Sequence, residues 1–159
     1  MTSAFLEISG RQVGKTHDLC AAALEHCERG GIAIVVTGPG MMDNIKQQVP
    51  HAHAVAIPYG LHTNEELLEQ IAVLRRVRWF FDEFDWYPDV PVMPGGYYCT
   101  TPKFVRQADA DPAGDTLLTL ARMLGGPTRQ RACLAQIGEH YPPHEHPTLM
   151  HGVYQEGQS

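Results

Sequence analysis

The sequence contains no Cys-x-x-Cys pair, no long hydrophobic run and no excess of positive charge. Its four cysteines are widely spaced, which is untypical of a zinc site or of a disulfide framework. No apolar run approaches the roughly 20 residues that a transmembrane helix needs, and the first residues lack the pattern of a secretory signal peptide. We therefore expect an unprocessed protein of the reducing cytoplasm that has no membrane partner.

Acidic residues outnumber basic ones by 18 to 12, which gives a formal net charge of −6. A protein of this charge has no general attraction for the phosphates of nucleic acid. We therefore expect any contact with DNA to be indirect or to need a partner. The length of 159 residues suits one domain, which we predict at residues 1–139, followed by an extended tail rich in histidine and proline at 140–159.

Short runs rich in β-branched or aromatic residues have the length of strands, and they lie at residues 5–8, 32–37, 54–57, 77–81 and 97–100. Helical spacing lies at residues 16–29, 41–48 and 63–76, and later at 115–124 and 128–138. The third of these helices begins with a capping-box pattern from Thr63 to Glu66. Alternating strands and helices predict an α/β fold whose mainly parallel sheet is covered by helices on both faces, with a short helical part at its C-terminal side.

Residues 9–16 read Ser-Gly-Arg-Gln-Val-Gly-Lys-Thr and join the first predicted strand to the first predicted helix. Phosphate-binding loops read G-x-x-x-x-G-K-[ST], so only the first position departs. In such loops the backbone N–H groups surround the phosphates, the lysine reaches the β- and γ-phosphates, and the hydroxyl binds Mg²⁺. We predict that a nucleotide contacts Ser9, Gly10, Arg11, Gln12, Val13, Gly14, Lys15 and Thr16. The alternative is an ordinary strand-to-helix turn with an exposed lysine.

An acidic pair, Asp82 and Glu83, follows the apolar run at 77–81. In a phosphoryl-transfer site, a carboxylate at the end of a buried strand holds the metal and a neighbouring one polarises the attacking water. We predict that Asp82 and Thr16 bind Mg²⁺ and that Glu83 acts on water. The alternative is a solvated strand end.

The fifth predicted strand ends in Thr100 and Thr101, just before Pro102. A strand beside the carboxylate strand that ends in a hydroxyl can place that group near the γ-phosphate. Either threonine could sense the phosphate, and we predict Thr101 as the nucleotide contact. The alternative is a plain strand that the proline stops.

These three motifs resemble, in the same order, those of the ATPase core of the large terminase subunit of tailed phages. That core belongs to the additional-strand, catalytic-glutamate class of P-loop ATPases, which also includes helicases. The resemblance covers about the first 105 residues and rests on residues 9–16, 80–83 and 100–102. It implies a RecA-like fold, ATP and Mg²⁺ as ligands, and a DNA-processing or packaging complex as client. It also implies a phage protein in the host cytoplasm, with Arg11 as an arginine finger acting in cis.

The chain departs from that family in two respects. Terminases carry an adenine-binding segment before the first strand and a nuclease domain after the ATPase, and we expect neither here. A stand-alone nucleotide-binding regulator or inhibitor with little or no turnover, acting on a partner protein or by self-assembly, is therefore one alternative. A nucleotide or small-molecule kinase is another, whose lid arginines would be Arg106, Arg122, Arg129 and Arg131.

Overall fold

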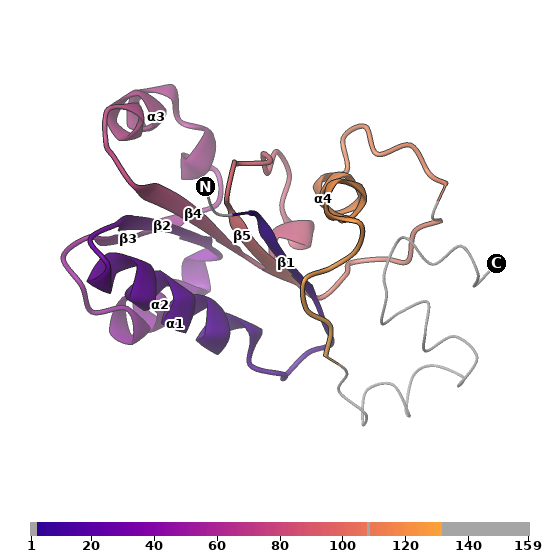
Figure 1. Ribbon diagram of the computed structural model, residues 1–159, viewed down its shortest axis with the longest axis horizontal. Coiled ribbons are helices and arrows are strands. Elements are labelled where there is room, and N and C mark those ends of the chain that lie inside the picture. The colour runs from indigo at the N-terminus through magenta and orange to yellow at the C-terminus, as the bar shows by residue number, and fades with distance from the viewer. Residues whose placement is uncertain (1–2, 108, 132–159) are drawn as a thin grey trace.

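Five apolar segments form one parallel sheet in the computed structural model, which describes residues 3–107 and 109–131. The strands are β1 (Phe5–Ile8), β2 (Ile32–Thr37), β3 (Ala54–Pro58), β4 (Val77–Asp82) and β5 (Tyr97–Thr100). Their order across the sheet is β1-β5-β4-β2-β3, and every pair of neighbours is parallel (Figure 1). The predicted α/β fold with a parallel sheet is confirmed.

Helices cover both faces of the sheet. They are α1 (Lys15–Glu28), α2 (Met42–Gln48), α3 (Glu65–Ala72) and α4 (Thr116–Leu124). Short 3-10 turns are η1 (Pro39–Met41), η2 (Leu61–Thr63) and η3 (Phe84–Trp86). Figure 1 shows α1 and α2 below the sheet and α3 and α4 above it. The result is three layers, as the alternation of strands and helices predicts.

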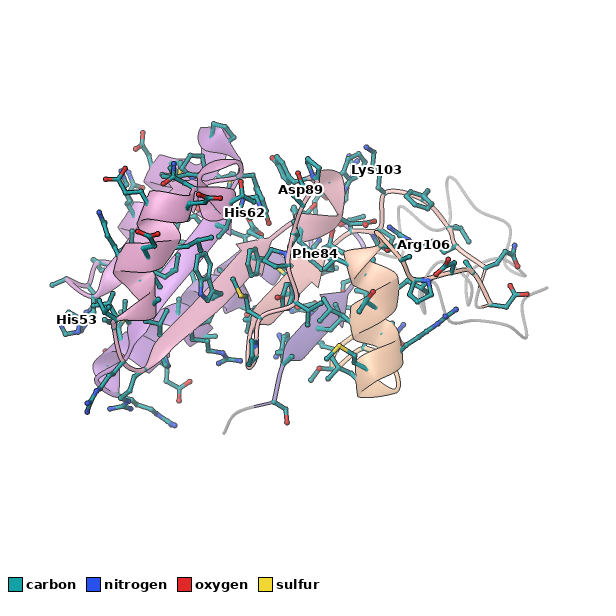
Figure 2. The ribbon with its side chains drawn as sticks, turned by 90° about the horizontal axis from the view of Figure 1, so that it is seen from above. His53, His62, Phe84, Asp89, Lys103 and Arg106 are labelled. Carbon is teal, nitrogen blue, oxygen red and sulfur yellow. The ribbon has the colours of Figure 1, made fainter. Side chains whose placement is uncertain are left out.

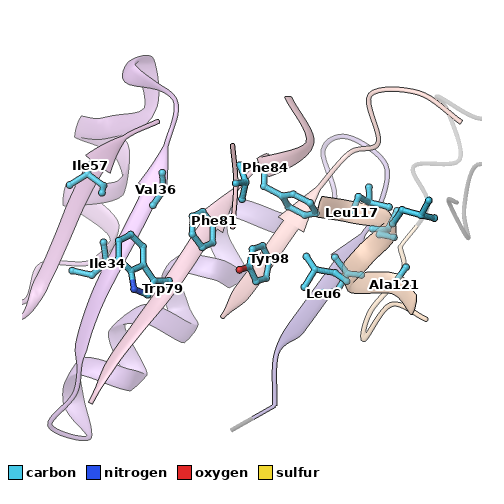
Figure 3. Close-up of a cluster of buried hydrophobic side chains, with 14 residues drawn as sticks. Leu6, Ile34, Val36, Ile57, Trp79, Phe81, Phe84, Tyr98, Leu117 and Ala121 are labelled. Carbon is cyan, nitrogen blue, oxygen red and sulfur yellow. The ribbon is translucent and has the colours of Figure 1, made fainter. Parts of the chain in front are cut away.

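Alternation along the strands supplies one apolar core to each face of the sheet. On the α1 side, Leu19 and Ala23 of α1 pack with Phe80 of β4 and Tyr97 of β5. On the opposite side, Phe81 stacks on Tyr98 with ring centroids 4.9 Å apart, and the α4 residues pack against the same cluster (Figure 3). Because residues of both faces are apolar, the central strands read as continuous hydrophobic runs.

Helix α3 differs at both ends from its sequence-based prediction. The cap is Asn64, whose Oδ1 accepts a hydrogen bond of 2.9 Å from the Leu67 amide. The predicted capping box at Thr63 is wrong, because Thr63 ends η2 and donates to the Gly60 carbonyl. The helix stops at Ala72 rather than at residue 76, where Arg76 has a φ of 58° and leaves the helical region.

Residues 128–131, which we call the edge segment, run beside β1. The Leu6 carbonyl accepts hydrogen bonds from the amides of Thr128 (2.7 Å) and Arg129 (3.1 Å), and the Ile8 amide donates to the Arg129 carbonyl. Positive φ angles at Gly125 and Gly126, and then Pro127, end α4 and redirect the chain. The helix predicted from residue 128 is therefore wrong over the edge segment. Its remainder and the predicted tail lie outside the described residues.

Candidate phosphate-binding site

The loop between β1 and α1 takes its shape from two residues in the left-handed region, Gln12 (φ 59°) and Gly14 (φ 85°). Glycine enters this region without a Cβ penalty, and Gly14 is the N-cap of α1. Gly10 is not among the residues with positive φ. The first amides of α1 have no carbonyl one turn earlier, so they and the positive end of the helix dipole are available to an anion.

Lys15 is the first residue of α1, and its side chain is only 7% exposed. Its Nζ donates hydrogen bonds of 2.8 Å to the Gly10 carbonyl and of 2.8 Å to the Thr101 hydroxyl. It also lies 3.6 Å from Glu83 Oε1. The ammonium thus joins the loop to the ends of β4 and β5, and the alternative of a turn with an exposed lysine is wrong.

Asp82 ends β4 and is 2% exposed, so the alternative of a solvated strand end is also wrong for this residue. Its Oδ1 accepts from the Thr16 hydroxyl at 3.0 Å and from the Cys99 thiol at 3.6 Å, and its Oδ2 accepts from the Thr37 hydroxyl at 3.1 Å. Burial raises the pKa of Asp82, while these hydrogen bonds and the Lys15 charge work against that rise.

Glu83 follows β4 directly and has a φ of 53°, which is unusual for a residue with a side chain. This conformation directs its carboxylate towards β5, where Oε1 accepts a 3.0 Å hydrogen bond from the Thr101 amide. Burial raises the pKa of Glu83, and the neighbouring Lys15 lowers it. A carboxylate that is oriented in this way and has a raised pKa can accept a proton at neutral pH.

The two threonines at the end of β5, Thr100 within the strand and Thr101 directly after it, face different surroundings. Thr101 contacts Lys15 through its hydroxyl and Glu83 through its amide, as described above. Thr100 is fully buried, and its hydroxyl accepts from the Asp85 amide and donates to the Thr101 carbonyl. The structure therefore places Thr101, not Thr100, beside the lysine of the loop.

A cleft of about 590 Å³ opens over these groups. Eight of the predicted site residues line it, namely Arg11, Gln12, Gly14, Lys15, Thr16, Asp82, Glu83 and Thr101. Four others on its wall were not among the predicted site residues: His17, Met41, Trp86 and Tyr87. His17 directly follows Thr16 on α1. Met41 of η1, Trp86 of η3 and Tyr87 reach the cleft from segments whose course depends on the sheet order, which the sequence alone does not fix.

Three predicted residues, Ser9, Gly10 and Val13, do not line the cleft. Ser9 is buried, and its hydroxyl donates a 2.8 Å hydrogen bond to Glu7 Oε2. Gly10 contributes its carbonyl to Lys15 and donates its amide to the Arg131 carbonyl at 2.9 Å. Val13 is half-buried in the loop.

The Thr16 hydroxyl and the Asp82 carboxylate lie together and offer oxygen atoms that could coordinate a hard metal ion. Mg²⁺ in proteins takes one or two such ligands and completes its shell with water and substrate phosphates. Zinc and the other softer metals prefer closed sets of nitrogen and sulfur. Among the described residues no cluster of three or more His, Cys, Asp or Glu side chains could hold such an ion. The oxygens present fit Mg²⁺.

Three side chains that support Asp82 were not predicted. Besides the contacts of Thr37 and Cys99, the Tyr59 hydroxyl donates a 2.7 Å hydrogen bond to the Asp82 carbonyl. Thr37 carries a usable signal, since it ends an apolar strand as Asp82 does. The contact of Cys99 can be foreseen only when the pairing of β5 with β4 is known, and that of Tyr59, which follows β3, only when the order β4-β2-β3 is known.

The four arginines considered for a kinase lid have partners elsewhere. Arg106 forms ion pairs with Asp85 and with Asp115, the latter at 2.6 Å. Figure 2 shows Arg106 on the segment after β5, with Lys103 and Phe84 nearby. The other three also bond within the chain: Arg122 to the Ala110 carbonyl, and Arg129 and Arg131 to Asp18.

No protein-family model matches the chain, and neither a curated protein nor a solved structure matches it. Over residues 3–107 and 109–131, no helix has both the length and the apolar character needed to cross a bilayer.

Proposed function

We propose that the protein binds a nucleoside triphosphate, foremost ATP, and hydrolyses it with Mg²⁺. One observation carries the proposal: the cleft brings together a lysine and a hydroxyl from the start of α1, two acidic residues from the end of β4 and a hydroxyl from the end of β5. Ligands of parallel α/β sheets bind at the carboxyl ends of the strands, where these groups lie.

The order of the strands supports the resemblance to additional-strand P-loop ATPases. Strand β5 lies between β1, which leads into the loop, and β4, which carries Asp82 and Glu83. An intervening strand of this kind defines that class, and it would make the domain a RecA-like P-loop fold. The free amides of α1 and the Lys15 ammonium would then bind the phosphates.

Thr16 and Asp82 would hold Mg²⁺ against the phosphates. When bound, the ion neutralises charge on the phosphate oxygens and lowers the barrier to their displacement. The Lys15 ammonium would move from its contacts with Gly10 and Thr101 to the β- and γ-phosphate oxygens. The two hydrogen-bond acceptors that it would leave are neutral, whereas a phosphate oxygen is anionic and forms a stronger, charge-assisted hydrogen bond.

Glu83 would accept a proton from the attacking water. As the water oxygen bonds to the γ-phosphorus, the bond to the bridging oxygen breaks and the diphosphate leaves. The Arg11 guanidinium, which is exposed on the wall of the cleft, would meet charge that develops on the γ-phosphate. Thr101 would report the loss of that phosphate, because it contacts both Lys15 and Glu83.

The resemblance to terminases suggests a client in DNA processing or packaging, and a phage origin. The net charge of −6 makes direct binding along DNA unfavourable, so such work would go through a protein partner or self-assembly. The four arginines considered for a kinase lid, Arg106, Arg122, Arg129 and Arg131, do not line the cleft. We therefore do not extend the proposal to phosphoryl transfer onto a second substrate.

Phosphate release from Mg·ATP tests the proposal, together with calorimetric binding of Mg·ATP to the same samples. Wild type is compared with Lys15→Ala, Glu83→Gln and the control Arg29→Gln, which breaks an exposed ion pair with Glu25 at the far end of α1. We expect turnover only in wild type and control, with binding kept in Glu83→Gln and weakened in Lys15→Ala.

Each other outcome has a distinct meaning. Binding without turnover in wild type would replace the hydrolase with a nucleotide-binding regulator. No binding of Mg·ATP, Mg·GTP or their diphosphates to wild type would overturn the proposal altogether.

A further inference from the structure

A charged residue lies in the middle of the strand that leads into the loop. Glu7 of β1 is 0% exposed and pairs in register with Cys99 of β5. Its neighbours Leu6 and Ile8 point to the α4 side of the sheet, so alternation directs the Glu7 carboxylate to the α1 side, beneath the loop. A buried carboxylate is costly unless it is hydrogen-bonded and paired with a positive charge.

The edge segment supplies that charge. Arg131 Nε donates to Glu7 Oε2 at 2.8 Å, and Arg131 Nη2 donates to Glu7 Oε1 at 3.0 Å. This two-point contact fixes the direction of the guanidinium as well as its position. The Ser9 hydroxyl completes the group, because it donates to Glu7 Oε2 at 2.8 Å and accepts from the Arg131 amide at 2.8 Å.

The same guanidinium reaches the helix on the other side of the loop. Arg131 Nη2 lies 2.8 Å from Asp18 Oδ2, and Arg129 Nη1 lies 2.9 Å from the same oxygen. Asp18 belongs to the first turn of α1. The edge segment therefore ties together the strand before the loop, the first residue of the loop and the helix after it.

We propose that Ser9, Glu7 and Arg131 are positioning residues that hold the phosphate loop at the spacing needed for a triphosphate. Ser9 stands where the usual motif has its first glycine, and a glycine there could make neither hydrogen bond of the hydroxyl. The departure from the motif is thus part of how this loop is held. The inference rests on the proposed function, that this loop receives phosphates.

Fixing the loop beforehand strengthens ligand binding, because less conformational freedom is lost when the phosphates arrive. Its amides must also point to one place at once to surround an anion. The Gly10 amide shows how direct the link is, since it donates to the carbonyl of Arg131 while the Gly10 carbonyl accepts from Lys15.

Replacement of Ser9 tests the role of the hydroxyl. We expect Ser9→Gly, which restores the usual motif, to bind Mg·ATP about tenfold more weakly than wild type, the loss expected when a hydrogen bond to a charged group is removed. Ser9→Ala should weaken binding equally. Equal or tighter binding by Ser9→Gly would overturn the proposal, and so would a loss confined to Ser9→Gly, because backbone freedom alone would then explain it.

Replacement of the arginine separates positioning from general stability. Arg131→Gln should weaken Mg·ATP binding, whereas Arg29→Gln, which breaks an Arg–Glu pair at the other end of α1, should not. Arg131→Lys keeps the charge but not the two-point contact. Relative to Arg131→Gln, it should therefore recover more of the wild-type stability to urea than of the wild-type affinity for Mg·ATP. Equal recovery of both would mean that the role is only structural.

Hydrogen exchange of the unliganded protein distinguishes failure of this inference from failure of the proposed function. Amides of residues 10–17 should exchange faster in Ser9→Gly and Arg131→Gln than in wild type and in Arg29→Gln. Unchanged exchange would overturn the positioning role even if wild type binds Mg·ATP. Faster exchange would support it even if wild type binds no nucleotide, in which case only the proposed function falls.

Discussion

The Thr16 hydroxyl donates a 3.0 Å hydrogen bond to Asp82 Oδ1, across 66 positions of sequence. The contact joins the first turn of α1 to the end of β4, and those elements also meet through the core on the α1 side of the sheet. Two oxygens that would share a metal ion are thus adjacent before the ion binds. This arrangement holds Asp82 as a buried carboxylate, and burial is unfavourable for its charged form.

We expect Asp82→Asn to stabilise the protein in the absence of Mg²⁺ and nucleotide. Burial raises the pKa of Asp82 above its ordinary value of 3.8. For a carboxyl with a raised pKa, stability is fully present below the unfolded pKa and is lost as pH rises through the folded one. The variant has no such proton to lose, so its midpoint of thermal unfolding at about pH 8 should be higher by roughly 2–4 °C, or about 1 kcal/mol.

Thermal unfolding of both proteins between about pH 4 and pH 8, with a chelator present, checks this expectation. The difference in unfolding midpoint between Asp82→Asn and wild type should shrink towards pH 4, where Asp82 of wild type also becomes neutral. A difference that grows on acidification would contradict a raised pKa of Asp82. Mg²⁺-dependent binding of ATP should be lost in the variant at every pH.

The loop should respond in opposite directions to changes at its two left-handed residues. Gln12→Gly removes a strained side chain at φ 59° and should stabilise the fold by up to about 1 kcal/mol after the extra freedom of the unfolded chain is counted. Gly14→Ala should destabilise it by about 1 kcal/mol because the strain is in the backbone, although the added Cβ would meet no atom of a more distant residue within 4 Å. Urea unfolding measures both, and two changes of the same sign would contradict the loop conformation.

Arg106 is the buried cation of a three-residue ion cluster with Asp85 and Asp115. Arg106→Leu would leave two carboxylates without their charge partner, so the free energy of unfolding should fall by about 3–5 kcal/mol. The exposed pair of Arg29 and Glu25 provides the control, and Arg29→Gln should cost less than about 1 kcal/mol. Equal losses in urea unfolding would contradict the burial of the cluster.

Three cysteines, Cys20, Cys27 and Cys99, are free and buried. Burial raises the pKa of Cys20 to about 12, and the pKa values of the other two thiols are raised by burial as well. At about pH 8 only about one Cys20 thiol in ten thousand is a thiolate, which is the reactive form. In a Cys133→Ser background a chromogenic disulfide reagent should therefore modify the native protein slowly and all three thiols after unfolding. Rapid reaction of one equivalent would contradict this packing.

The sequence predicts the strands well because each is a short apolar run bounded by polar or turn residues. Both faces of the sheet are covered, so β2 and β4 needed no alternation to be recognised. Helix ends were harder, because they depend on single backbone angles such as φ 58° at Arg76. The extended path of the edge segment depends on hydrogen bonds to β1, which no local pattern records.

The candidate site, like the fold, could be predicted only in part. Lys15, Thr16, Asp82 and Glu83 belong to recognisable motifs, and the structure brings them into one cleft, as expected for a loop and an acidic pair that each follow a strand of a parallel sheet. The partners of Ser9 could not be predicted, because Arg131 reaches it only through the pairing of the edge segment with β1. A glutamate inside the apolar run of β1 was nevertheless a signal that a buried charge would need a partner.

The position of β5 sets the width of the cleft. Strands β1 and β4 are two interstrand spacings apart, roughly 9.6 Å, because one strand separates them. Backbone hydrogen bonds maintain this separation, and side-chain replacements leave them in place. Side-chain changes at the surface of the cleft therefore leave the span between the lysine-bearing loop and the acidic strand end unchanged.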